Sequence, residues 1–180
     1  MGAPGLVIVT DVGSPGDGLA AAAALAVATA SAGQTPGRPG VVLAEVGGAP
    51  QRRPTLLSSA SARAVEGRLA RLDGIRAAAR GRVCWAGLAV EDGWRERLAG
   101  LVAAAGGPAV AHLPASQWRE ALDDDRLPVA AAAVRADVPP NRSLLALLAG
   151  ELRTRGVGFR VVTRPLGLVG ARRALAGLEP

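Results

Sequence analysis

The residues with the clearest chemical potential form a glycine-rich stretch near the start of the chain. Gly13 and Gly18 have the spacing of the two glycines in the phosphate-binding template G-x-x-x-x-G-K-[ST], and Gly16 adds a third. The N–H groups of such a loop, with the positive end of the helix that follows, attract phosphate. Leu19 stands at the lysine position and Ala20 at that of the Mg²⁺-binding hydroxyl. The stretch predicts a phosphate loop without the side chains of an NTPase.

The other side chains of the loop do not replace those contacts. All 21 basic residues are arginine, so no lysine is present anywhere in the chain. Asp17 adds a carboxylate, which repels a phosphate by about 1–4 kcal/mol at ~4 Å. Losing the lysine contact removes about 1.5–3 kcal/mol of binding free energy. The lost contact and the repulsion by Asp17 together weaken a micromolar site to roughly millimolar. We expect a glycine turn without a cofactor, with weak nucleotide or phosphate binding as the alternative. The remnant comprises Gly13, Ser14, Pro15, Gly16, Asp17, Gly18, Leu19 and Ala20.

Polar residues near the ends of the predicted strands form a second tier of candidates. His112 could act as a base or a pH-dependent switch, although a strand-end histidine with an ordinary hydrogen bond is the preferred interpretation. Glu45 could meet a ribose hydroxyl in a dinucleotide site, but the Tyr/Lys pair of short-chain dehydrogenases is missing. No metal site is expected, and the acidic run 123–125 is predicted to be a solvated loop. The second tier comprises Asp11, Glu45, His112 and Thr163.

Six apolar runs predict the strands that would position these residues. Most are nearly continuous rather than alternating, which is typical of strands covered by helices on both faces. Helical periodicity between them implies an α/β fold. We expect one three-layer domain over residues 1–180, with a mostly parallel sheet of about six strands, similar to a P-loop NTPase. The predicted strands are Leu6–Val9, Val41–Glu45, Val83–Leu88, Ala109–Leu113, Val129–Val134 and Gly158–Thr163.

The predicted helices are recognised by their apolar faces. The first covers Leu19–Ala32, and the last, Leu166–Leu178, is expected to pack on the sheet with weak membrane contact at most. Asn141 is a plausible N-cap, and the glycines at 106–107 end a helix. The expected faces are Val65, Leu69 and Leu72; Trp94, Leu98, Leu101 and Val102; Leu144, Leu145, Leu148 and Leu152; and Leu168, Val169, Leu175 and Leu178.

Composition limits the classes of partner and compartment. The formal net charge is +6, which favours acidic partners, but the arginines are scattered and no specific nucleic-acid binding is expected. The single Cys84 excludes an internal disulfide and is predicted to be a buried core thiol. No convincing signal peptide is present, and a cytoplasmic location is expected.

Three segments together resemble the ParA/MinD-type P-loop ATPases, including their CpaE-like members. The loop at 13–18 resembles the phosphate loop of these proteins, and Gly40–Glu45 resembles their second strand, which ends in an acidic residue. Pro108–Pro114 resembles the strand that ends in their Asp-x-Pro sequence. The resemblance covers most of the chain and implies a nucleotide-dependent dimer that hydrolyses ATP.

The chain departs from that family at the residues that carry its chemistry. The catalytic lysine corresponds to Leu19, the hydroxyl residue to Ala20 and the additional signature lysine to Ser14. The aspartate of the fourth strand corresponds to His112, and the asparagine after the later strand to Thr163. These replacements leave the question of enzymatic activity open and favour its absence.

The sequence predicts a non-enzymatic pseudo-ATPase relative that acts through protein–protein contacts. The partner implied by the resemblance is an intact ParA/CpaE-type ATPase, or a second copy of the chain, in cell-pole, division or pilus-assembly organisation. The alternatives are a divergent ATPase or nucleotide-binding protein of the ParA/MinD type, and a binder of small acidic ligands.

Overall fold

One twisted sheet forms the centre of the molecule. In the computed structural model the described residues are 5–12, 17–32, 41–47, 55–56, 83–105, 108–136, 142–162 and 168–176. They form a seven-stranded sheet in the order β3-β4-β2-β5-β1-β6-β7. β3 (Thr55–Leu56) runs antiparallel to its neighbour, and the other strands are parallel. The parallel strands are β1 (Leu6–Val12), β2 (Val41–Val46), β4 (Val83–Leu88), β5 (Ala109–Leu113), β6 (Val129–Ala136) and β7 (Gly158–Val162).

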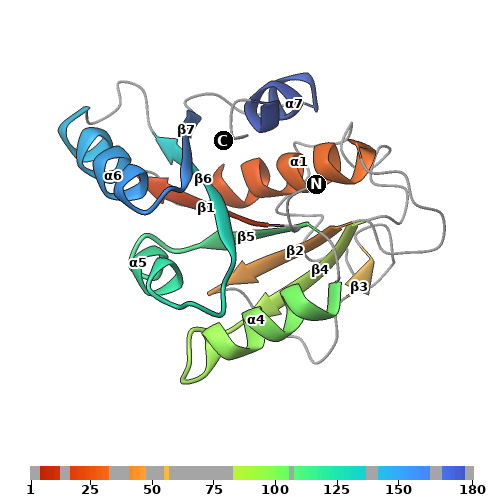
Figure 1. Cartoon of the computed structure of the whole chain (residues 1–180). Coiled ribbons are helices and arrows are strands. Elements are labelled where there is room, and N and C mark those ends of the chain that lie inside the picture. Colours follow the sequence, from red (N-terminus) through yellow and green to blue (C-terminus); the bar gives the residue numbers. More distant parts are fainter. Residues whose placement is uncertain are drawn as a thin grey trace.

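Helices cover both faces of this sheet (Figure 1). Two of them, α1 (Asp17–Ala32) and α7 (Leu168–Ala176), lie on one face. The other face carries α4 (Trp94–Ala105), α5 (Trp118–Leu122) and α6 (Arg142–Thr154). This arrangement confirms the predicted α/β fold with a mostly parallel sheet, and it is consistent with a P-loop NTPase-like layout.

The helix α1 is buried on all sides, which explains its composition. Every residue from 21 to 28 is at most 3 % exposed, and most of them are alanine. A helix that is apolar all round belongs in an interior, and alanine allows neighbouring elements to approach it closely. The neighbours include α7, whose Ala171 and Ala174 lie in the same apolar cluster. The helix begins at Asp17, two residues before its predicted start.

The first strand is longer than predicted, and this places one candidate residue differently. β1 continues to Val12, so Thr10 and Asp11 belong to the strand rather than to the loop after it. Asp11 pairs in register with Arg135 on β6, and this ladder extends the strand beyond its apolar run. A polar side chain at the end of a paired strand is therefore held by the sheet.

Two helices on the outer layers differ from their predicted faces. In α6, Leu145, Leu148 and Leu152 are buried as predicted, but Leu144 is 37 % exposed and lies off the buried stripe. In α7 the prediction for Val169 is wrong, since this side chain is 66 % exposed. Ala171 and Ala174 of α7 lie instead in the apolar cluster that contains α1.

The remaining helix predictions agree with the structure only where it describes them. In α4, Trp94, Leu98 and Val102 are buried, as their spacing predicts. The short helix α5 and the strand β3 were not predicted, because five and two residues are too few to show a period. Among the described residues, no helix is long and apolar enough to cross a membrane. Outside the described residues lie Val65, Leu69, Leu72, Gly106, Gly107, Asn141 and Leu178.

Candidate functional site

Ionisable side chains from four neighbouring strands meet at the carboxyl edge of the sheet. Glu45 on β2 pairs in register with His112 on β5, and Asp11 on β1 pairs with Arg135 on β6. His112 also pairs with Val9, which lies in the core beneath α1. Because side chains alternate along a strand, Asp11 points to the same face as Val9. All four side chains therefore lie on the face that α1 covers.

Asp11 and His112 form the closest contact in this row. The imidazole Nε2 of His112 lies 2.9 Å from the Oδ2 of Asp11, although the residues are 101 positions apart in the chain. Their side chains are only 14 % and 13 % exposed. A carboxylate can only accept, so the Nε2–H of the imidazole donates this hydrogen bond. The other two polar atoms, Asp11 Oδ1 and His112 Nδ1, are buried and have no hydrogen-bond partner among the residues that the structure describes.

The carboxylate of Asp11 also lies against the first turn of α1. A Cβ atom built on Gly18 would be 2.5 Å from both oxygens of this carboxylate. Any larger residue at this position would force the carboxylate to move, since real Cβ contacts are essentially never so short. The first turn of a helix presents free N–H groups and a positive partial charge, so it favours a negative group. Asp11 places a negative charge beside this turn, at Gly18, from within the protein.

The residue at the lysine position of the phosphate-loop template is part of the core. Leu19 is 5 % exposed and belongs to the apolar cluster between α1 and the sheet. It contributes packing at the place where an NTPase would present a charge. Asp17 and Ala20 begin α1, but their side chains lie outside the description, as do the whole of Gly13, Ser14, Pro15, Gly16 and Thr163.

The two outer members of the row are also fixed by the protein. Glu45 is only 5 % exposed, beside His112 in the adjacent strand. Arg135 donates hydrogen bonds from Nη1 to the carbonyl oxygens of Ala136 and Val162, which ties the ends of β6 and β7 together. No group of three His, Cys, Asp or Glu side chains that could hold a metal ion occurs among the described residues.

Sequence reasoning found the members of this row separately but missed the arrangement. Asp11, Glu45 and His112 were all second-tier candidates, yet nothing in their spacing predicts the Asp11–His112 hydrogen bond. The strand order supplies this contact, because β5 inserts beside β1. Arg135 was missed entirely. Its only signal is a charge inside an alanine-rich strand, which can mark the carboxyl end of that strand.

The acidic run at 123–125 is the predicted loop, with Asp123 and Asp125 exposed, but Asp124 is less solvated than expected. The side chain of Asp124 is only 7 % exposed and accepts hydrogen bonds from Arg126 Nε at 2.9 Å and Nη2 at 2.7 Å. These hydrogen bonds lower the pKa of Asp124 to about 2. Asp123 forms an ion pair with Arg155 at 2.6 Å. Two aspartates of the run therefore form ion pairs with arginines, which are abundant in this chain.

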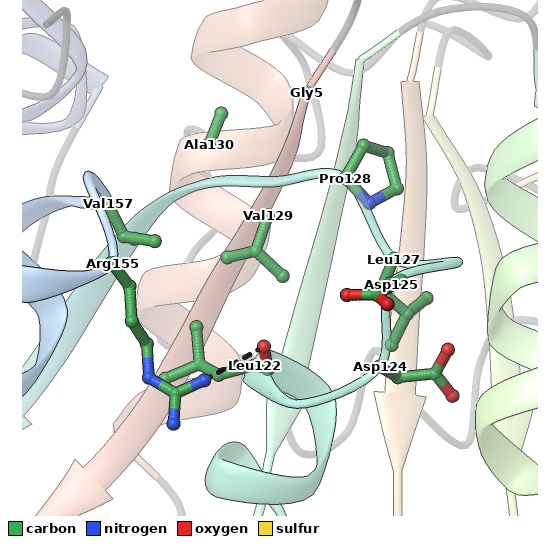
Figure 2. Close-up of a pocket in the computed structure, with 10 residues that line it drawn as sticks. All are labelled: Gly5, Leu122, Asp124, Asp125, Leu127, Pro128, Val129, Ala130, Arg155 and Val157. Carbon is green, nitrogen blue, oxygen red and sulfur yellow. Dashed lines mark hydrogen bonds between the residues drawn. The ribbon is translucent and has the colours of Figure 1, made fainter.

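A shallow hollow of about 430 Å³ lies at the opposite, amino edge of the sheet (Figure 2). Gly5 and Pro128, which precede β1 and β6, form part of it. Arg155 reaches across it and donates a hydrogen bond of 3.1 Å to the carbonyl of Leu122. Open α/β sheets bind ligands at the carboxyl ends of their strands, so we place the candidate site at Asp11 rather than at this hollow.

Cys84 on β4 is half-buried, so the prediction of a fully buried thiol is only partly met. Burial raises the pKa of this thiol, which keeps it protonated and chemically inert. It takes no part in the candidate site.

Comparison with known proteins adds no relative whose site could be set beside this geometry. No protein-family model, no curated protein and no solved structure matches the chain.

Proposed function

We propose that the protein is a non-enzymatic relative of the ParA/MinD-type ATPases that acts through protein–protein contacts. One observation carries this proposal: the Asp11 carboxylate lies at the first turn of α1, hydrogen-bonded to His112 and in contact with Gly18. In a phosphate loop this helix end receives the anion. Here an internal carboxylate takes the same electrostatic role, so a nucleotide phosphate would meet repulsion in place of attraction.

The buried Leu19 supports the same conclusion. A lysine that binds phosphate must leave the apolar core, whereas this leucine is part of it. A fold that retains its parallel sheet without this contact still offers surfaces to a partner. The partner we propose is an intact ATPase of the same type or a second copy of the chain, in a cytoplasmic assembly.

Calorimetric titration with Mg²⁺–ATP, combined with thermal unfolding, tests the proposal. A ligand at 100 times its dissociation constant stabilises a protein by about 2.7 kcal/mol. We expect no detectable heat and no change in Tm at micromolar ATP, and no ATP-dependent dimer in sedimentation. A rise in Tm at micromolar ATP, or a dimer that forms only with ATP, would contradict the proposal.

A further inference from the structure

A second surface with its own chemistry lies at the β7 edge of the sheet. Among the described strands, β7 is last in the sheet order and pairs with β6 alone. The outer side of such a strand carries N–H and C=O groups that can bind the backbone of another extended segment. This edge is separate from the Asp11–His112 pair on β1 and β5.

A hollow of about 310 Å³ lies beside this edge, between α6 and the start of β7. Its volume lies at the lower end of the range of ligand pockets, about 300–1,000 Å³, and suits one or two side chains. Ala149 and Phe159 are half-buried in its lining, and Arg153 is exposed there. No described atom lies within 4 Å of a Cβ built on Gly156, so the hollow is open at this turn.

The side chains of β7 present different chemistry to its two faces. Phe159 and Val161 pack against the apolar cluster on the α6 side. Arg160 lies between them in sequence, so it points to the opposite face, and it is exposed. Among the described residues, neither Arg160 nor Arg153 forms an ion pair. The edge therefore offers apolar contact on one face and an available guanidinium on the other.

The charge distribution along the chain indicates the sign of the charge that a partner of this edge should carry. Positions 142–180 contain seven arginines and two glutamates, a net charge of +5 out of +6 for the whole chain. Such an excess in this part of the chain favours acidic partners. An antiparallel pairing of two β7 strands centred on Arg160 would set this arginine opposite itself, which is destabilising.

We propose that the β7 edge binds an extended, acidic segment of a partner protein by adding it to the sheet as a further strand. Alternate residues of that segment are apolar and enter the hollow beside Phe159. The residues between them are Asp or Glu and pair with Arg160 across the strands. Main-chain hydrogen bonds supply affinity, and the two faces supply specificity.

A fluorescently labelled peptide with six alternating valine and glutamate residues tests this proposal by anisotropy. We expect saturable binding to the full chain, weakened at least tenfold by Arg160→Glu. The matched control is Arg97→Glu, because Arg97 is an exposed arginine on α4 whose ion pair with Glu91 is long, at 3.9 Å. This control should leave the affinity within a factor of two, and a peptide with lysine for glutamate should not bind. Equal losses in both variants would overturn the proposal.

N-methylation of the peptide tests strand addition itself. Methyl groups on alternate amides block one hydrogen-bonding edge of an extended peptide and leave the other edge free. One of the two alternating patterns should abolish binding while the other retains it. Binding that survives both patterns, or binding of vesicles with anionic lipid but not of the peptide, would overturn the proposal. None of these results bears on the ATP titration, so the two proposals fail independently.

Discussion

Two carboxylates at opposite edges of the sheet are both paired, but their surroundings differ. Asp124 lies at the amino edge, where Arg126 and Arg95 surround it on the surface. Asp11 lies at the carboxyl edge, in contact with one imidazole and with the first turn of α1. The first pairing holds a loop in place. The second lies at the edge of the sheet where open α/β folds bind their ligands.

The largest expected effect is a difference in stability between alanine substitutions at two helical glycines. Gly18→Ala would press a methyl group into the Asp11 carboxylate, so we expect the free energy of unfolding to fall by about 1–3 kcal/mol. The control Gly100→Ala is open on α4, with nothing within 4 Å, and should gain up to about 1 kcal/mol from helix propensity. Chemical denaturation measures both. Equal gains in the two variants would show that Asp11 does not contact α1.

The next effect concerns the strength of the buried pair. A double-mutant cycle with Asp11→Ala and His112→Ala should give a coupling free energy of about 1–2 kcal/mol, because the contact is short and mostly buried. The corresponding cycle for Asp124 and Arg126 should give a smaller value, since the Arg126 side chain is 54 % exposed and water screens its charge. A coupling near zero for Asp11 and His112 would remove the distinction between the two edges.

A smaller effect is expected beside Asp11, on the other face of the same strand. Thr10 is 4 % exposed, and its Oγ1 has no hydrogen-bond partner within the described part of the chain. It pairs with Leu113 and Val134, so it lies among apolar residues. Thr10→Val removes the unsatisfied hydroxyl and should raise the free energy of unfolding by about 1 kcal/mol. A loss of stability would mean that the hydroxyl has a partner, such as a bound water.

The smallest effect is the acid dependence of the amino edge. The folded pKa of Asp124 is lowered to about 2, below the ~3.9 of an unfolded chain. Its contribution is therefore complete above about pH 4 and is lost as the pH falls towards 2. The stability difference between the wild type and Asp124→Asn should shrink over this range in urea titrations. A difference that stays constant from pH 5 to pH 2 would contradict the lowered pKa.

The sequence predicted the elements of the fold better than the contacts between them. Continuous apolar runs identify buried parallel strands, so β4 and β5 have their predicted bounds. Periodicity identifies the buried stripe of α4 in the same way. Periodicity wrongly assigned Leu144 and Val169 to buried helix faces, because an apolar residue next to a buried face has nearly the same spacing as one within it. The packing of neighbouring helices decides between these positions, and a single segment does not contain that information.

The candidate site was predicted as separate residues, without its geometry. Leu19 and Ala20 stand where the template has its lysine and hydroxyl, so the sequence alone predicts a weak phosphate loop. The role of Asp11 does not follow from the sequence, because it depends on the strand order that sets β5 beside β1 and on the close approach of Gly18. Contacts between residues about a hundred positions apart arise only from the assembled sheet.

The most direct test of the account is to remove the internal carboxylate and measure anion binding. Calorimetric titration with pyrophosphate should show no binding to the wild type and millimolar binding to Asp11→Ala, because the carboxylate beside Gly18 is then gone from the positive end of α1. The control Asp124→Ala makes the same change in charge at the other edge and should not bind. Binding by the wild type, or none by a folded Asp11→Ala protein, would contradict the claim that Asp11 holds the anion position.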